Sequence, residues 1–283
     1  MNASPSKFRL PSPGRLLSHL VLLAFAIYSV YPISQIVTIS LRPESRLLST
    51  SLALIPDGAT LQNFRTLFLE TDFLRWLGNS ALVSLAVTIT GVALASTAGY
   101  AVSRFRFAGK SKILTGLLVT QMFPATMLLL PLYLILIKLE LINSYLGVIV
   151  IYSASALPFC IWQLKGYYDT ISRSLEEAAS IDGCSRWQTF TQVIFPLALP
   201  GVVITALFSF MTAWNEYVIA ALILQDSKIF TLPVGLRMFQ GNMTTQWGLY
   251  AAGALVVSIP VVLLFLFLSR YLIGGMTAGG VKE

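Results

Sequence analysis

Long uncharged, apolar stretches alternate with short charged ones along the whole chain. Six stretches lack Asp, Glu, Lys and Arg, and even the shortest, 141–164, has 24 residues. A helix of about 20 predominantly apolar residues spans a bilayer, and an open chain satisfies its backbone hydrogen bonds in lipid only as helices. The pattern therefore predicts an all-α integral membrane protein with six transmembrane helices in one bundle. We expect these helices at about 16–41, 77–103, 113–137, 141–164, 197–223 and 248–271.

The composition excludes a soluble helical protein. Hydrophobic residues make up 56% of the chain, charged residues only 11%, and the mean hydropathy is +0.77. Soluble domains carry about 25% charged residues. The buried core helices of such domains run to about 10–14 residues, which is shorter than every uncharged stretch here. Lipid is therefore the expected surrounding of most of this surface.

Lysine and arginine are distributed unevenly between the predicted loops. With a cytoplasmic N-terminus, 12 of the 19 basic residues fall on the cytoplasmic side and 7 on the other. Four of the 12 lie in the compact turn RFRFAGKSK, 104–112, and an excess of basic residues in short loops marks the cytoplasmic side. We therefore predict that both termini are cytoplasmic. We attribute the net charge of +7 to this excess of basic residues in the cytoplasmic loops. We therefore expect no nucleic acid among the partners.

The segment 172–196 is predicted to form a cytoplasmic helix–turn–helix. It contains EEAASIDG, 176–183, a polar island between apolar stretches. Ser174 and Glu177 have the spacing of a capping box, in which each side chain bonds a free backbone N–H at the start of a helix. Gly183 stands where a glycine commonly ends one. The island is therefore expected to be one short helix with defined ends.

A second short helix is predicted directly after the island. Ser185 and Gln188 repeat the capping-box spacing. Two short helices that project from the membrane are suited to docking on another protein, whereas the alternative is an ordinary capped connection. The residues of the predicted docking face recur at helical spacing, and two of them are small enough to permit close contact. Its members are Leu175, Ala178, Ala179 and Asp182.

A lone carboxylate is predicted inside the fifth membrane helix. Glu216 follows a run of uncharged residues in the sequence WNEY, 214–217. An ionisable side chain within the membrane costs at least about 2.5–3.5 kcal/mol on insertion scales, so it normally faces a cavity or a partner group. One reading is that Trp214, Asn215, Glu216 and Tyr217 line a substrate path or gate, because aromatic faces stack on sugar rings. The other is a buried hydrogen bond to a neighbouring helix or subunit.

Small residues recur on the second predicted helix. Gly91, Ala95 and Gly99 form a small-xxx-small pattern that lets another helix approach closely. Packing inside the bundle and a subunit interface are both compatible with this pattern.

The sequence contains no complete motif for catalysis, nucleotide binding or metal binding. The sequence AGKS, 108–111, resembles the end of a phosphate-binding loop, but the required glycine five residues before Gly109 is replaced by Arg104. A single histidine, His19, cannot build a zinc site with only two scattered cysteines. We therefore predict no catalytic residues, no metal site and no cofactor on this chain, and a protein that is not an enzyme.

The polar island resembles the EAA signature of permease subunits of ATP-binding-cassette (ABC) importers. That signature reads Glu-Ala-Ala-x3-Gly-x9-Ile-x-Leu-Pro, and the chain has EEAASIDGCSRWQTFTQVIFP. Valine and phenylalanine stand at 193 and 195, where the family usually has isoleucine and leucine. The residues at matching positions are Glu177, Ala178, Ala179, Gly183 and Pro196.

Further segments are similar to the smaller permease subunit of the maltose-type carbohydrate importers. They are YAVSRFRFAGK, QMFPA, LKGYY, WNEY and the tail GGMTAGGVKE, and with the six helices they cover nearly the whole chain. The resemblance implies a single transmembrane domain, 1–283, in the inner membrane of a bacterium. It also implies that the island docks in a cleft of an ATPase subunit, so the implied coupling residues are Ser174, Glu177, Ala178, Ala179, Asp182 and Gly183.

The same resemblance implies the partners. These are a second permease subunit, two cytoplasmic ATPase subunits that bind ATP and Mg²⁺, an extracytoplasmic solute-binding protein, a sugar substrate and membrane lipid. The tail is expected to reach the ATPase pair. An importer of another solute, such as a polyol, glycerol phosphate or a glucosyl-polyol, remains an alternative, because the EAA signature concerns the ATPase and not the cargo. An ion-coupled transporter would need more intramembrane carboxylates than Glu216 alone.

Overall fold

The protein is all-helical in the part of the chain that the structure describes. Its one extended pairing there is an isolated bridge between Gln240 and Thr245, so the predicted all-α class is confirmed for these residues. The predictions for the N-terminal segment and the end of the tail fall on residues outside this part. The structure is a computed structural model, and the residues that it describes are 13–43, 55–241 and 245–278.

Four helices are each long and apolar enough to cross a membrane. They overlap the first, second, fourth and sixth predicted spans. Two further spans exist only as bent pairs of helices, so the described residues provide four candidate spans, or six if each bent pair counts as one. The four continuous helices are α1 (Pro13–Ser40), α3 (Phe73–Arg104), α6 (Tyr145–Thr170) and α13 (Trp247–Ala278).

The third predicted span, 113–137, is not one straight helix. It bends by 93° between its two halves, α4 (Lys110–Met122) and the pair η2 (Ala125–Leu128) and α5 (Leu129–Lys138). The cause is Pro124, since the residue before a proline is pushed into an extended conformation, and Phe123 has φ −80° and ψ 128°.

The fifth predicted span, 197–223, is interrupted as well. It begins with α10 (Leu199–Asn215), which makes a 78° bend with the helical segment that precedes it. It then breaks again at Glu216, whose backbone is extended with φ −73° and ψ 126°, before the short α11 (Val218–Ile223). No proline lies at this second break, and the contacts of Glu216 described below account for it.

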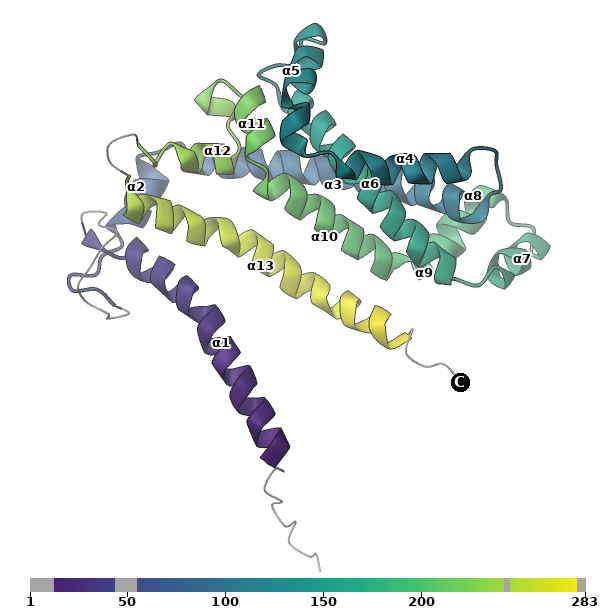
Figure 1. Ribbon diagram of the computed structural model, residues 1–283, viewed down its shortest axis with the longest axis horizontal. Coiled ribbons are helices and arrows are strands. Elements are labelled where there is room, and N and C mark those ends of the chain that lie inside the picture. The colour runs from purple at the N-terminus through teal and green to yellow at the C-terminus, as the bar shows by residue number, and fades with distance from the viewer. Residues whose placement is uncertain (1–12, 44–54, 242–244, 279–283) are drawn as a thin grey trace, which may run out of the picture.

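Short helices connect the long ones at the two ends of the bundle. One end, called the α7 end, carries the helix–turn–helix and the ends of α3 and α6; the other, called the α12 end, carries α2 and α12 (Figure 1). The connecting elements are α2 (Gln62–Leu69), α7 (Ser174–Ile181), α8 (Arg186–Gln188), the π-helix η3 (Thr189–Ile194), α9 (Phe195–Leu197), η4 (Ser227–Ile229) and α12 (Leu232–Arg237).

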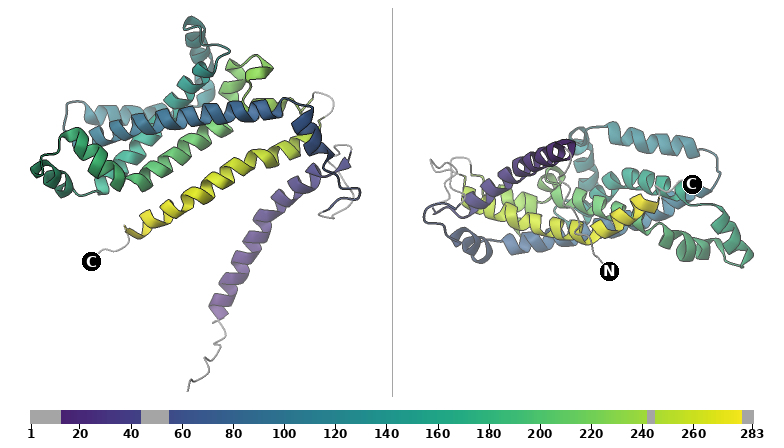
Figure 2. Two further views of the ribbon diagram at one scale, coloured as in Figure 1. Left: turned by 180° about the vertical axis from the view of Figure 1, so that it is seen from behind. Right: turned by 90° about the horizontal axis from the view of Figure 1, so that it is seen from below.

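Helices α3, α6 and α10 form the centre of the bundle. Helix α13 runs beside α10, and α1 contacts the bundle mainly through α13 (Figure 1; Figure 2). The small residues of α3 face this centre: a Cβ added at Gly91 would lie 2.9 Å from the Ser209 hydroxyl of α10, and one at Gly99 would lie 3.2 Å from Cβ of Leu164 on α6. Of the two readings of the pattern, packing inside the bundle therefore explains both glycines.

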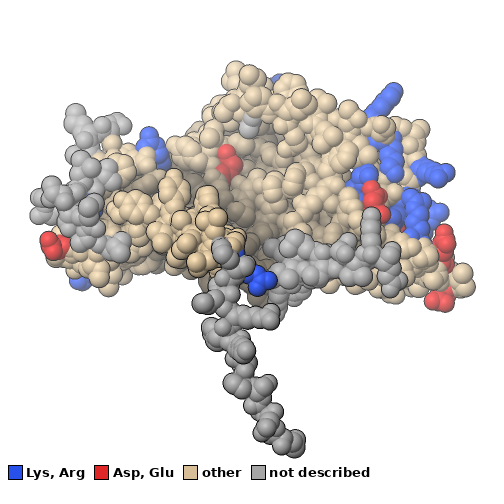
Figure 3. Space-filling view, turned by 60° about the horizontal axis from the view of Figure 1, so that its bottom comes forward, with Lys and Arg blue, Asp and Glu red and all other residues tan. Residues whose placement is uncertain are grey.

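The surface is apolar in the middle and charged at the ends. None of the side chains in the most apolar window of α1 is buried. Lysine and arginine gather at the α7 end in the space-filling view, and the broad middle of that face is almost entirely uncharged (Figure 3). Such a surface is stable beside lipid or another membrane subunit, as the hydropathy pattern predicts.

Candidate functional site

The end of α7 has the geometry that the sequence predicts for Gly183. This glycine has φ +86°, a left-handed conformation that costs a side-chain-bearing residue free energy. Its N–H donates to the Ser180 carbonyl at 3.2 Å, and the Cys184 N–H donates to the Ala179 carbonyl at 2.9 Å. These two bonds are those of a Schellman motif. Because they satisfy the last carbonyls of α7, the chain turns sharply into α8.

The start of α7 differs from the prediction. The expected capping box between Ser174 and Glu177 is absent, because Ser174 is already the first helical residue and Arg173 at the cap position makes no side-chain cap. The Ser172 hydroxyl instead accepts the Ser174 N–H at 3.3 Å and shares a 2.8 Å hydrogen bond with the Ser174 hydroxyl. A serine that bonds two residues ahead competes in this way with a helix cap.

The second predicted capping box is confirmed. The Gln188 N–H donates to the Ser185 hydroxyl at 3.3 Å, and the Ser185 N–H donates to Oε1 of Gln188 at 2.8 Å. Both helices of the pair therefore have defined ends, although the first one owes its start to Ser172.

The predicted docking face of α7 is divided in the structure. Ala179 is buried against the chain's own turn, whereas Ala178 and Asp182 are exposed. The face is split because α7 packs on η3, and Ala179 is the buried residue of α7. Ile181 is 87% exposed and Leu175 42%, so the outward surface of α7 contains an isoleucine that was not among the expected residues.

The two glutamates of the island point in different directions. Glu177 is exposed, and Glu176 turns inward to an ion pair with Arg104 at the end of α3. Sequence reasoning treated Arg104 only as a topology charge. The pairing joins residues 72 positions apart, and the one local signal for it is a basic residue directly at the end of an apolar helix.

Glu216 is held by hydrogen bonds inside the bundle. Its Oε2 accepts from the Tyr152 hydroxyl of α6 at 2.7 Å and from the Ala220 N–H at 3.2 Å, and its Oε1 accepts from the Ile219 N–H at 3.0 Å. The carboxylate thus caps the start of α11, where it is favoured by the free N–H groups and the helix dipole. Of the two readings of this residue, these contacts are those of the buried hydrogen bond.

The other residues of the WNEY sequence lie beside a cavity of about 310 Å³. Trp214 is 2% exposed, stacks on Phe210 at 5.3 Å between ring centroids, and donates its indole N–H to the Val257 carbonyl at 3.3 Å. Its ring is therefore part of the core. Asn215 and Tyr217 are exposed at the break after α10, and Tyr217 stays a candidate for stacking on a ligand.

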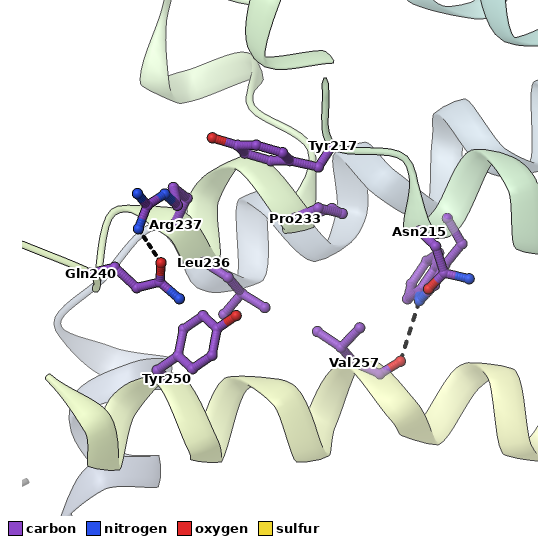
Figure 4. Close-up of a pocket in the computed structure, with 9 residues that line it drawn as sticks. Asn215, Tyr217, Pro233, Leu236, Arg237, Gln240, Tyr250 and Val257 are labelled. Atoms are coloured by element: carbon purple, nitrogen blue, oxygen red, sulfur yellow. Dashed lines mark hydrogen bonds between the residues drawn. The ribbon is translucent and has the colours of Figure 1, made fainter. Parts of the chain in front are cut away.

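The remaining walls of this cavity come from α12, from Gln240 in the connection after it, and from α13. Sequence reasoning missed these residues because they are distant from the WNEY sequence along the chain and lie beside it only in the folded structure. Arg237 donates a hydrogen bond to the side-chain oxygen of Gln240 (Figure 4), so a guanidinium, two amides and two tyrosine rings meet at one cavity. The lining residues beyond the WNEY sequence are Pro233, Leu236, Arg237, Gln240, Tyr250 and Val257.

The sequence matches the family model described as the binding-protein-dependent transport system inner membrane component over residues 88–277. That match covers more than half of the chain, from the middle of α3 almost to the end of α13. The chain belongs to this family of membrane-embedded transport components.

Named relatives and a solved structure agree with this assignment. The maltose/maltodextrin transport system permease protein MalG of Salmonella typhimurium is 37% identical over 94% of this chain and 95% of its own length. The maltodextrin transport system permease protein MdxG of Bacillus subtilis is 33% identical over the full length of both chains. A chain of a bacterial ABC transporter involved in the import of the acidic polysaccharide alginate has the same fold, with a TM-score of 0.81 at 21% identity over 93% of this chain and 99% of that one.

The contacts of Glu216 give a first prediction. Glu216→Ala removes every acceptor that caps α11, and the lost cap is expected to lower the free energy of unfolding by about 0.5–2 kcal/mol. Glu216→Gln keeps one acceptor oxygen and is expected to lower it less. Thermal unfolding of the purified protein measures both. Asn215→Ala is the matched control, because that exposed side chain bonds only the carbonyl of Met211 in its own helix; a glutamine variant as damaging as the alanine variant would contradict the capping role.

Proposed function

We propose that this chain is one permease subunit of an ATP-driven carbohydrate importer. It would form half of the translocation pathway together with a second permease subunit. The named relatives are maltose and maltodextrin permeases, and their identity of 33–37% over nearly the whole chain supports a carbohydrate cargo, with maltodextrins as the first candidates. The membership in a family of inner membrane components supports a place in the bacterial inner membrane.

The α7 end is the cytoplasmic end in this proposal. The excess of lysine and arginine at this end supports that orientation, and it makes both termini cytoplasmic. The α12 end then faces outward, toward an extracytoplasmic solute-binding protein. The cavity beside Tyr217 lies nearer to that outer end, because α10 runs from the α7 end toward α11.

The outward surface of α7 is the proposed docking site for a cytoplasmic ATPase subunit. Two such subunits would hold ATP and Mg²⁺, so this chain needs no cofactor. The observation that carries the proposal is the match to the EAA signature at an exposed, well-defined helix, with Gly183 at its end in the conformation that favours glycine. The proposed contact residues are six of those exposed on α7 and its turn: Ser174, Glu177, Ala178, Ile181, Asp182 and Gly183.

Transport follows from a shift between inward-open and outward-open arrangements of the bundle. The ATPase pair binds one arrangement more tightly when ATP closes it, and that difference in affinity biases the equilibrium. The broken helices next to Pro124 and Glu216 are positions at which such rearrangements require little loss of helical hydrogen bonding.

Reconstitution tests the proposal. The chain is inserted into liposomes with its partner permease, the two ATPase subunits and the solute-binding protein, and uptake of labelled maltodextrin is compared with that of labelled glycerol phosphate and a polyol. We expect uptake of the maltodextrin that needs both ATP and the binding protein. Transport by this chain without any ATPase would refute the importer assignment, and preference for a non-sugar solute would refute the carbohydrate cargo.

A further inference from the structure

One charged contact ties α7 to the membrane-spanning part of the bundle. The Arg104 guanidinium, at the last residue of α3, donates through Nε to Oε1 of Glu176 in the first turn of α7. The Arg104 side chain is 5% exposed and the Glu176 side chain 19%. The pair is therefore largely shielded from water, and its hydrogen bond joins two charged groups.

The same guanidinium reaches a third element. Nη2 of Arg104 donates to the Ile171 carbonyl at 2.8 Å, in the connection between α6 and α7. The Tyr100 hydroxyl, one turn earlier on α3, donates to Oε2 of Glu176 at 3.3 Å. We call Arg104, Tyr100, Glu176 and the Ile171 carbonyl the α3–α7 junction. Because both carboxylate oxygens and two guanidinium nitrogens are engaged, the junction fixes the orientation of α7 as well as its distance from α3.

The end of α6 is attached to the same place. The Ser103 hydroxyl donates to Oδ1 of Asp169 at 2.5 Å, and the ammonium group of Lys165 donates to Oδ2 of Asp169 at 2.5 Å. Ser103 precedes Arg104 directly, so the last turns of α3 and α6 and the first turn of α7 are joined through adjacent residues. A displacement of α7 cannot be absorbed by the connection 171–173 alone.

A buried ion pair of this kind is weak evidence for stability. Removing two charges from water costs nearly as much as their attraction returns, whereas removing one partner leaves the other buried and unpaired. Apolar residues would join three helices at least as firmly. What the ion pair adds is a directional contact between a helix outside the membrane and one inside it.

We propose that Arg104 and Glu176 are positioning residues for energy coupling, which transmit the movement of α7 directly to α3 and α6. This inference rests on the proposed docking of α7 to an ATPase subunit. It assigns separate roles to the two neighbouring glutamates: Glu177 faces the partner, and Glu176 holds the transmembrane helices. Loss of the junction leaves α7 docked while its movement no longer reaches the pathway.

The test uses the complete complex in liposomes. Glu176→Gln keeps the size of the side chain and an acceptor oxygen but removes its charge. The matched control is Asp72→Asn, the same change in the exposed ion pair with Arg75, 3.6 Å apart at the opposite end of α3. Co-purified ATPase, ATP hydrolysis and maltodextrin uptake are measured for each. We expect ATPase binding and hydrolysis to persist in Glu176→Gln while uptake per ATP falls about fivefold or more, the lower end of a typical coupling between two sites.

Two further variants keep the result interpretable. Arg104→Lys keeps the charge but not the fork of donors that reaches both Glu176 and the Ile171 carbonyl, and we expect it to lose part of the uptake per ATP. The exchange Arg104→Glu with Glu176→Arg is expected to recover part of what Glu176→Gln loses. The inference would be overturned if Glu176→Gln and Arg104→Lys both left uptake per ATP unchanged and only lowered the amount of complex in the membrane. Absence of ATP-dependent uptake in the unmodified complex would instead refute the proposed function.

Discussion

Replacing Ile181 by aspartate is expected to weaken the binding of the ATPase subunit that docks on α7, while the permease itself stays folded. Ile181 is 87% exposed at the last residue of α7, so the change removes little packing within the chain. An isoleucine that becomes fully buried at an interface contributes about 1.5–3 kcal/mol, and about 1.4 kcal/mol corresponds to a tenfold change in Kd. An aspartate at that place also buries an unpaired charge. We therefore expect the affinity for the ATPase to fall at least about tenfold.

Co-purification of the ATPase with the two permease subunits measures this effect. Ile55→Asp is the matched control, because Ile55 is also exposed, at 73%, but lies outside the α7 end. The control variant should retain the ATPase fully. Equal retention in the Ile181 variant would show that the outward surface of α7 is not the docking surface, and the proposal would have to be given up.

Replacing Trp214 by alanine is expected to disrupt the packing of α10 on α13 and to destabilise the folded protein. The indole is 2% exposed, stacks on Phe210 and donates its N–H to the Val257 carbonyl of α13. Truncation of a buried tryptophan to alanine typically costs about 3–5 kcal/mol. The expected result is a sharp fall in the amount of folded protein in the membrane, measured by thermal unfolding in detergent and by the yield of assembled complex.

Tyr217→Ala is the comparison within the same sequence motif. Tyr217 is 38% exposed and lines the cavity, and exposed substitutions usually change the free energy of unfolding by about 0.5 kcal/mol or less. The Tyr217→Ala protein should therefore assemble normally, with any effect confined to sugar uptake. A Trp214→Ala protein that assembles fully but takes up sugar with a raised KM would contradict the core role and restore the predicted path-lining one.

The amino-acid sequence by itself determined where the four continuous apolar helices lie, and it predicted the end of α7 and the start of α8 correctly. It did not predict the bends in the third and fifth spans. Uncharged runs of 24 residues or more leave the backbone no other stable state in lipid. Gly183 and the Ser185–Gln188 box are equally local, because each depends on contacts over at most a few residues. Ser174 shows the limit of this reasoning: the Ser172 hydroxyl accepts the Ser174 N–H that the capping box would give to the Glu177 side chain. A spacing rule does not include such a neighbouring acceptor.

Only the tertiary structure decided which polar groups meet. Glu176 and Glu177 are adjacent and chemically identical, yet one pairs with Arg104 and the other faces outward, because the packing of α7 on η3 sets its rotation. Trp214 and Glu216 likewise belong to the interior only because α13 and α6 present the Val257 carbonyl and the Tyr152 hydroxyl to them. These partners lie 43 and 64 residues away in the chain. Such contacts depend on the relative placement of whole helices, which no local pattern of residues contains.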